Sequence, residues 1–406
     1  MSKVHIVGGG ITGLSVARYL GNYQVCIWER ERLGGLCFSF KIEEFTFDLD
    51  AHFLHFRSSK IKEEVLSRSK DILVPHKRSS WIYWKRRLIP FPFQRHLSYL
   101  PASFFSRILM DLLCYCWREK YGETLSKFIL SRYGPTLYKI FFLPYLSKFY
   151  KISPDKIPFR EVKEFFPQDN ISQILEGLLT RRIVSTGYNS IFYYPVSGGI
   201  KSFIERWGEG IEKNVKKGEV RKVYWRDRKV EVEGKEIPYD FLVYTSPFPT
   251  LFRVLEPFPS NFSHLLPFFY TNSILCYNIG MKKDRWEKVH WVYFPEEEFV
   301  FFRVGFYSHI APLMAPPGCS SIYVETAVSP HETKVELEER VIDDLLKTGI
   351  LKNKGEVEVI KTISIPYGYP LFLGERKELD NFQHWLEERG IFLSGRYGRW
   401  RYYSME

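Results

Sequence analysis

Three glycines near the start of the chain, Gly8, Gly10 and Gly13, have the spacing of a loop that binds phosphates. They follow a short β-branched run, KVHIV, and precede LSVARYL, whose apolar residues recur at helical spacing. In a strand, loop and helix of this kind, the first glycine makes the tight turn and the second lets the backbone approach a pyrophosphate. The third lets the helix pack closely on the strand. The N–H groups at the start of the helix would then face the phosphates.

An acidic residue stands where such a unit binds ribose. The run QVCIWE predicts a second strand that ends on Glu29, at the distance where dinucleotide sites place an acid on the ribose hydroxyls. A glycine motif alone is weak evidence. The two strands, the glycines, the helix and the acid in register together predict a dinucleotide-binding unit.

Composition sets the outer bounds. The 406 residues carry a net charge of +11, and 17% of them are aromatic. The charge favours an anionic ligand or surface, while the basic residues are scattered, which argues against a nucleic-acid partner. The six cysteines, at positions 26, 37, 114, 116, 276 and 319, form no CxxC pair and no metal-type cluster. They predict reduced thiols in a cytoplasmic protein without a bound metal.

No signal peptide and no membrane span are expected. The N-terminus lacks an apolar stretch of signal-peptide length, and no apolar run approaches the roughly 18 residues that a span needs. The segments near 98–120 are basic and amphipathic, so peripheral membrane contact could occur.

The residues after Glu29 carry a family resemblance. Arg32, Leu33, Gly34 and Gly35 resemble the second glycine motif of the superfamily of FAD-dependent amine oxidases and UDP-galactopyranose mutases. The resemblance implies FAD as the cofactor. It also implies a set of cofactor-binding residues in the first part of the FAD domain and near its adenine end: Gly8, Gly10, Gly13, Glu29, Arg30, Gly34, Gly35 and the backbone near Val220.

The segment FTFDLDAHFLHF, residues 45–56, resembles the part of the same superfamily that passes beside the flavin ring. The family has glycine, glycine and histidine where this chain has Asp50, Ala51 and His52. The resemblance implies a catalytic role for His52. The loss of both glycines removes positions that allow close backbone approach.

Residues 290–312, HWVYFPEEEFVFFRVGFYSHIAP, resemble the mutases more than the oxidases. There the resemblance places Tyr293 and Arg303 on the nucleotide-sugar, implies a catalytic role for Arg303, and puts Lys163 near the place of a second diphosphate cation. Arginine suits a diphosphate because its planar guanidinium donates two parallel hydrogen bonds. The alternative is that Arg303 is a strand residue paired with one of the glutamates at 296–298.

The C-terminal stretch SGRYGRWRYYSME resembles the mutase motif that closes over the flavin. The resemblance implies that Gly395, Arg396 and Met405 bind the cofactor, and that Tyr402 reaches the substrate diphosphate. Both ends of the chain would therefore meet at one site.

The pattern of elements predicts an α/β fold in which a Rossmann-like FAD domain of the glutathione-reductase type is interleaved with two other lobes. We expect the FAD domain to comprise residues 1–60, 196–255 and 385–406. Residues 61–195 would form a mainly helical lobe, and residues 256–384 a substrate lobe built on an antiparallel sheet.

Three functions stay open. The first is a mutase-like enzyme acting on a UDP-sugar through N5 of reduced flavin, with an external reductant such as NAD(P)H. The second is an amine oxidase, protoporphyrinogen oxidase or desaturase. The third is a flavin-binding protein without catalysis. The sequence leaves open whether the protein is a monomer or a homodimer.

Overall fold

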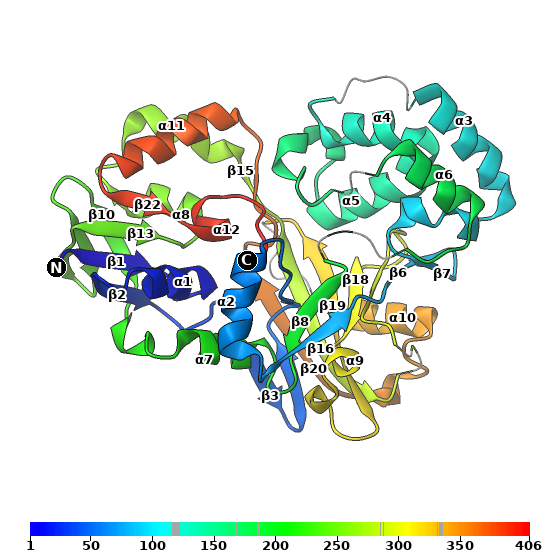
Figure 1. The fold of residues 1–406 in the computed structure, drawn as a ribbon, viewed down its shortest axis with the longest axis horizontal. Helices are drawn as coiled ribbons and strands as arrows, with labels where there is room; N and C mark the ends of the chain where they lie inside the picture. The colour runs from blue at the N-terminus through cyan, green and yellow to red at the C-terminus, as the bar shows by residue number, and fades with distance from the viewer. Residues whose placement is uncertain are drawn as a thin grey trace.

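The computed structural model describes residues 1–115, 122–166, 169–184, 187, 189–284, 286, 288–330, 332 and 336–406. Figure 1 shows three groups of elements: an α/β lobe that contains the N-terminus, a helical lobe, and a large sheet that lies against both. The C-terminus lies where the three groups meet.

A five-stranded parallel sheet forms the centre of the α/β lobe, in the order β22-β13-β1-β2-β9. Its strands are β1 (Lys3–Val7), β2 (Gln24–Glu29), β9 (Val215–Lys217), β13 (Phe241–Tyr244) and β22 (Ile391–Leu393). The chain moves from β1 to one side for β2 and to the other side for β13. The carboxyl end of β1 is therefore a topological switch point, where open α/β sheets bind their ligands.

Helices cover this sheet and its edges: α1 (Ile11–Tyr19), α2 (Ser59–Ser69), α7 (Ile200–Gly208), α8 (Phe248–Val254), α11 (Arg376–Glu387) and α12 (Gly395–Gly398). Helix α7 packs beside α1, and Trp207 Nε1 donates to Ser15 Oγ over 3.0 Å. A β-meander is also present, as β10 (Val220–Tyr224), β11 (Lys229–Val232) and β12 (Lys235–Pro238). Short β14 (Leu255–Glu256) extends it by pairing with β10.

The second large sheet has seven strands in the order β20-β16-β19-β18-β17-β6-β7. They are β6 (Ser80–Trp84), β7 (Arg87–Pro90), β16 (Ser273–Lys282), β17 (Trp291–Tyr293), β18 (Arg303–Phe306), β19 (Cys319–Val328) and β20 (Val357–Ile365). Only β17 and β6 pair in parallel. Strands β6 and β7 form an antiparallel hairpin at one edge of this sheet.

Both faces of this sheet are covered at its centre, which explains why β16 and β19 are buried almost throughout. On one face Cys276 and Tyr323 pack with the core around the hairpin of β3 (Ser39–Ile42) and β4 (Phe45–Asp48). On the other face Leu275 and Tyr277 pack with α10 (Glu338–Thr348). Since side chains alternate along a strand, one face of β16 and β19 is turned toward the α/β lobe.

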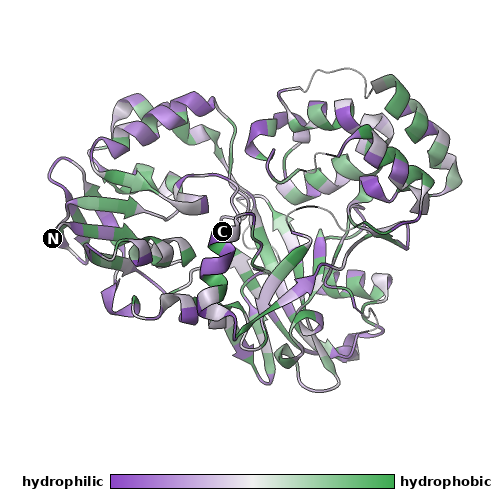
Figure 2. Cartoon of the chain, in the orientation of Figure 1, coloured by the Kyte–Doolittle hydropathy of each residue, from purple (hydrophilic) through white to green (hydrophobic). Residues whose placement is uncertain are grey.

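The helical lobe contains α3 (Phe105–Tyr115), α4 (Leu125–Leu137), α5 (Leu143–Tyr150) and α6 (Ile171–Leu179). Their apolar faces pack around aromatic residues such as Phe93 and Phe141, whose rings stack at 4.4 Å. Helix α9 (Tyr307–Ile310) and the pairs β5 (Leu73–Lys77) with β8 (Ile191–Pro195) and β15 (Phe269–Tyr270) with β21 (Leu371–Phe372) complete the fold. Figure 2 shows hydrophobic residues concentrated in the strands of both large sheets.

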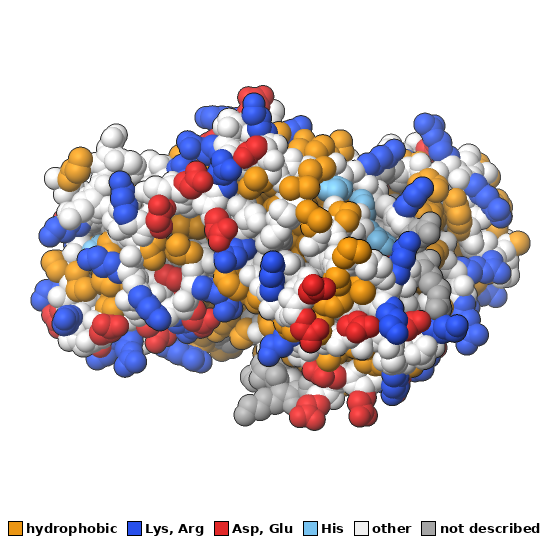
Figure 3. All heavy atoms as spheres, turned by 90° about the horizontal axis from the view of Figure 1, so that it is seen from below, with side chains coloured by type: hydrophobic (Ala, Val, Ile, Leu, Met, Phe, Trp, Pro, Cys, Tyr) orange, Lys and Arg blue, Asp and Glu red, His pale blue; other side chains and the backbone are white. Residues whose placement is uncertain are grey.

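Basic and acidic side chains are mixed on the surface, and the described cysteines are free thiols. The face seen in Figure 3 carries Lys and Arg side chains dispersed among Asp and Glu. The cysteines that the structure describes, Cys26, Cys37, Cys114, Cys276 and Cys319, are all free, and Cys116 lies outside the described residues. In the described ranges no helix is long and apolar enough to cross a membrane, and no three His, Cys, Asp or Glu side chains there are grouped to hold a metal ion.

Candidate active site

The first glycine loop lies at the switch point, between β1 and α1. A Cβ on Gly13 would lie 2.0 Å from the carbonyl oxygen of Gly8, so helix and strand can pack this closely only with glycine there. A Cβ on Gly10 would meet nothing within 4 Å. Gly10 is therefore not required for packing within the protein, and the open space beside its backbone fits a pyrophosphate.

The second glycine motif packs against the first. The Gly34 N–H donates to the carbonyl of Gly9 over 2.9 Å, and a Cβ on Gly35 would approach the Cα of Gly10 to 3.3 Å. The carboxylate of Glu29 accepts from the Gly9 N–H at 2.7 Å, which holds the acid at the same loop. The structure thus brings the predicted glycines and the predicted ribose acid together.

Two other predicted cofactor residues, Arg30 and Val220, lie near Glu29 at the end of β2. The Gly218 N–H donates to the carbonyl of Glu29 over 3.0 Å, so β10, which starts at Val220, begins beside the end of β2. Arg30 instead points outward: its side chain is 63% exposed and pairs with Glu31 and Glu219. Val220 therefore lies at the loop, whereas Arg30 lies on the rim.

The C-terminal stretch closes this site from the other side. A Cβ on Gly395 would lie 2.3 Å from the hydroxyl of Thr12, so α12 packs directly on the first turn of α1. Met405 Sδ lies 3.3 Å from Cys37 Sγ, just after the second glycine motif. Between them, Arg396 donates to the carbonyl of Gly368 over 2.8 Å. Gly395 and Met405 therefore lie against the two glycine motifs, whereas Arg396 is directed toward the segment at Gly368 and Tyr369.

A row of side chains crosses the seven-stranded sheet beside this edge. Tyr293 on β17 is opposite Arg303 on β18, Arg303 is opposite Glu325 on β19, and Glu325 is opposite Cys276 on β16. Cross-strand partners project from the same face of a sheet. Because Cys276 packs on the face toward the α/β lobe, this whole row lies on that face of the sheet.

Arg303 is held by a buried acid. Its guanidinium donates two hydrogen bonds to Glu325, one through Nε and one from Nη2 to Oε1 at 2.6 Å, and the Glu325 side chain is 0% exposed. The partner is therefore not one of the glutamates at 296–298. Burial raises the pKa of Glu325 to about 8, although Arg303 opposes the shift, and Asp50 adds to it through a hydrogen bond and its charge.

The segment with the two replaced glycines reaches the same place. The charge of Asp50 contributes to the raised pKa of Glu325, and the Asp50 side chain accepts from the N–H of Ala51 at 2.7 Å. His52 Nδ1 lies 3.1 Å from the carbonyl oxygen of Asp50. Desolvation lowers the pKa of His52, the charge and the backbone carbonyl of Asp50 oppose that shift, and the charges of Arg396 and Arg303 lower the pKa further. The lowered pKa favours a neutral imidazole at neutral pH.

Tyrosines line the space between the sheet and the C-terminal stretch. The ring of Tyr369 lies 5.4 Å from that of Tyr402, and Arg396 lies over both rings, 5.0 and 4.7 Å from their centroids. Tyr145 from α5 contacts Tyr293 at 5.7 Å. These contacts connect predicted substrate residues from distant parts of the chain.

One phenol in this group lacks a partner. The hydroxyl of Tyr323 is buried with no hydrogen bond to any described residue, and the ring lies 5.8 Å from the Arg303 guanidinium carbon. A buried hydroxyl without a partner is costly. The environment of Tyr323 therefore suits a polar ligand beside Arg303.

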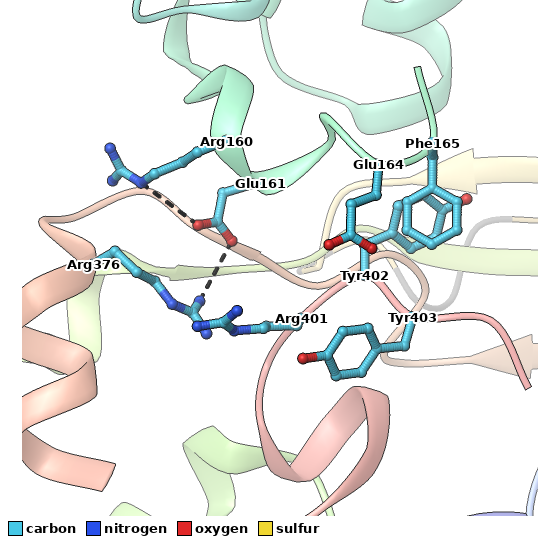
Figure 4. A pocket seen from close by; sticks show the side chains of 8 residues that line it. All are labelled: Arg160, Glu161, Glu164, Phe165, Arg376, Arg401, Tyr402 and Tyr403. Atoms are coloured by element: carbon cyan, nitrogen blue, oxygen red, sulfur yellow. Dashed lines mark ion pairs between the residues drawn. The ribbon is translucent and has the colours of Figure 1, made fainter. Parts of the chain in front are cut away.

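A pocket opens on the outer side of Tyr402 (Figure 4). It has a volume of about 140 Å³ and is lined by Arg160, Glu161, Glu164, Phe165, Arg376, Arg401, Tyr402 and Tyr403. Buried Glu161 pairs with Arg376 at 3.5 Å and with Arg160 at 3.7 Å. The pocket thus carries three guanidiniums and two carboxylates.

Lys163 is exposed on the turn that also carries Glu161 and Glu164, and the described contacts do not bring its side chain into this group. Arg160 and Arg376, which were not predicted from the sequence, line the pocket beside Tyr402 instead.

Glu325 was also missed. The signal was present in the sequence, since a single acid within the apolar run SSIYVETAV on an interior strand needs a partner when buried. The identity of that partner depends on the order of the strands in the sheet, and no local pattern in the sequence specifies this order.

Comparison with known proteins fits this arrangement. Residues 6–67 match the family model of an NAD(P)-binding Rossmann-like domain. A crystal structure of reduced UDP-galactopyranose mutase has a similar fold, with a TM-score of 0.92 and 24% identity. The similarity covers 99% of this chain and 91% of that one.

Two further structures are similar over nearly the whole chain. A proposed protoporphyrinogen oxidase from Exiguobacterium sp. 255-15 has a TM-score of 0.76 and 18% identity, covering 97% of this chain and 94% of that one. A redesigned putrescine oxidase has a TM-score of 0.65 and 14% identity, covering 97% and 93%. Likeness at these identities establishes the fold, and the expected α/β class with a Rossmann-like unit is confirmed.

Proposed function

We propose that this protein is an FAD-dependent enzyme that acts on a UDP-sugar in the manner of UDP-galactopyranose mutase. The observation that carries the proposal is the fold likeness to that mutase, with a TM-score of 0.92 over 99% of the chain. The cross-strand row of Tyr293, Arg303 and Glu325, on the face of the sheet that is turned toward the α/β lobe, adds a local reason.

The two glycine motifs and the C-terminal stretch would hold the FAD. The open backbone at Gly10 would receive the pyrophosphate, Glu29 would bind the ribose, and the segments around Asp50 and Arg396 would contact the flavin. Bound FAD in its reduced form supplies a nucleophilic N5 that can attack the anomeric carbon of a sugar, so no protein nucleophile is required.

The protein's own contribution is to bind and orient the nucleotide-sugar. Tyr293 and Tyr402 offer hydroxyls from two sides, and Arg303 offers a guanidinium whose fork matches phosphate oxygens. The arginines of the outer pocket favour entry of an anion next to Tyr402. The surrounding aromatic rings exclude water, which strengthens each of these polar contacts.

An anaerobic assay tests the proposal. Purified protein is loaded with FAD, reduced with dithionite and incubated with UDP-galactopyranose, and the sugar is analysed by NMR. We expect conversion to UDP-galactofuranose without consumption of an electron acceptor. Failure to convert the UDP-sugar in the reduced, FAD-loaded protein would refute the proposal.

An FAD-dependent oxidase is the second candidate, and one observation favours it. Glu325 already neutralises Arg303 and Asp50 adds another carboxylate, which suits a neutral or cationic substrate better than a diphosphate. Oxygen uptake with amines, in the same preparation of oxidised protein, distinguishes this candidate from the first.

A further inference from the structure

A lysine of the helical lobe holds the loop between β17 and β18, residues 294–302. The Nζ of Lys148, on α5, donates to the backbone carbonyl of Phe294 over 2.9 Å and to that of Phe301 over 3.3 Å. It also donates to the carbonyl of Glu296. Phe294 and Glu296 belong to the arm of the loop that follows β17, and Phe301 to the arm that precedes β18. One ammonium group therefore joins both arms to α5.

The ammonium form of Lys148 matches this set of acceptors. It carries three N–H donors, one for each carbonyl, whereas the neutral amine carries two. Burial lowers the pKa of Lys148 to about 7, and the charge of Lys151 adds to that shift. The carboxylates of Glu296, Glu297 and Asp344 oppose it. At pH 6.5 the ammonium is therefore the larger fraction, and each of its donors has an acceptor in the loop.

The same face of α5 contacts the two strand ends that this loop connects. Tyr145, Lys148 and Phe149 are spaced i, i+3 and i+4, so their side chains project from one side of the helix. The ring of Tyr145 lies 5.7 Å from that of Tyr293, the last residue of β17. The ring of Phe149 lies 5.0 Å from that of Phe302, the residue just before β18. Contacts to both strand ends therefore flank the hydrogen bonds of Lys148.

Helix α10 holds the tip of the same loop. Arg340 donates to the carbonyl of Glu298 over 2.9 Å. The carboxylate of Asp344 accepts from the N–H of Val300 at 2.8 Å. These contacts do not use the carbonyls that Lys148 bonds. Loss of the ammonium would therefore leave the tip attached to α10 while both arms lose their hydrogen bonds to α5.

We propose that Lys148 is a positioning residue for substrate binding, which fixes Tyr293 and Arg303 relative to the helical lobe by holding both arms of the loop between them. Tyr293 and Arg303 are cross-strand partners, so where their side chains lie depends on where these arms lie. A misplacement of about 1 Å in a site can cost about 100-fold in rate. That the two residues bind a nucleotide-sugar rests on the proposed function, whereas the tie between the loop and α5 does not.

Two substitutions and one control test the tie. Lys148→Met keeps an unbranched side chain and removes all three donors, whereas Lys148→Gln keeps an amide with two donors. Lys139→Met removes the same charge from an exposed lysine of the same lobe and is the control. Circular dichroism verifies the fold of each variant, and Lys148→Gln carries the test if Lys148→Met does not fold.

Hydrogen exchange of the FAD-loaded protein, measured by mass spectrometry without substrate, tests the tie directly. The N–H of Phe294 bonds to the carbonyl of Phe302, and the N–H of Phe302 to that of Glu325, so these two amides report on the neck of the loop. At pH 6.5 we expect them to exchange about tenfold faster in Lys148→Met than in the parent or in Lys139→Met, with Lys148→Gln in between. Parent-like exchange in both Lys148 variants would overturn the proposal.

Titration with UDP at the same pH tests the consequence for the site. Lys148→Met should bind UDP about tenfold more weakly than the parent, while its FAD affinity and the control stay parent-like. In an Arg303→Ala background the same substitution should weaken binding by no more than about threefold, because a residue that acts through Arg303 then has less to position. An equal fall in both backgrounds would show that Lys148 has no positioning role toward Arg303. If the parent itself does not bind UDP, the proposed function is wrong, and the exchange data still decide the tie.

Discussion

Two alanine substitutions in the first glycine motif, Gly10→Ala and Gly13→Ala, should separate the effect on cofactor binding from the effect on folding. Gly10 has φ −69° and ψ 179°, which alanine adopts freely, and its new Cβ would meet nothing within 4 Å. We expect a change in folding stability within about 0.5 kcal/mol. The methyl group would instead occupy the space of the pyrophosphate, so FAD affinity should fall at least tenfold, or about 1.4 kcal/mol.

By contrast, Gly13→Ala should lower the stability of the fold. Its Cβ would lie 2.0 Å from the carbonyl oxygen of Gly8 and 3.1 Å from the carbonyl carbon, and ordinary C···O contacts begin near about 3.3 Å. Strand β1 and helix α1 must therefore move apart by more than about 1 Å. Overpacking of this kind costs about 1 to 3 kcal/mol, partly offset by the roughly 1 kcal/mol that alanine gains over glycine inside a helix.

The assays are urea unfolding of the FAD-free proteins and titration with FAD, followed by flavin fluorescence. The parent and Gly10→Ala should unfold at the same urea concentration, and Gly13→Ala at a lower one. Parent-like FAD affinity in Gly10→Ala would refute the assignment of the open space to a pyrophosphate. Parent-like stability in Gly13→Ala would refute the packing argument.

Three other predictions concern the substrate side and the histidines. Arg303→Ala should weaken UDP binding by about 1.5 to 3 kcal/mol, the range for a hydrogen bond to a charged group, with FAD content unchanged; calorimetry showing parent-like affinity would contradict this. His52→Ala should alter the rate of flavin reduction while FAD stays bound, and a loss of folding without that selective effect would indicate a structural role. Buried His5 and His290 have pKa values lowered to about 4, so unfolding binds protons and stability should fall between pH 6.5 and 4. The loss is at most about 3 kcal/mol for each histidine, and urea midpoints that are constant over this range would rule it out.

The dinucleotide half of the site could be read from the sequence because its determinants are local. Gly8, Gly10 and Gly13 lie within six residues, and their spacing is set by one turn between one strand and one helix. Glu29 follows from the length of that helix and the next strand. The structure places these residues at one loop, as the pattern predicts.

The substrate-binding half of the site depends on which strands of the seven-stranded sheet pair and in what register. Tyr293 and Arg303 were selected by resemblance, and β17 and β18 do place them opposite each other. Glu325 meets Arg303 only because β19 pairs with β18, and the charge of Asp50, which also raises the pKa of Glu325, comes from a segment 275 positions away in sequence. Arg303 was expected to be available for a phosphate or paired with a neighbouring glutamate, and neither expectation contains this buried acid.

Sequence by itself determined the α/β class and the glycine loops, since each is encoded in short patterns whose geometry is nearly independent of the rest. The C-terminal stretch was expected at the same site only because it resembles the mutase motif. Only the tertiary structure decided the charge state around Arg303. Net charge at a buried point depends on which side chains meet there and on how completely water is excluded. Those two quantities arise when the seven-stranded sheet packs against the α/β lobe, and no local pattern carries them.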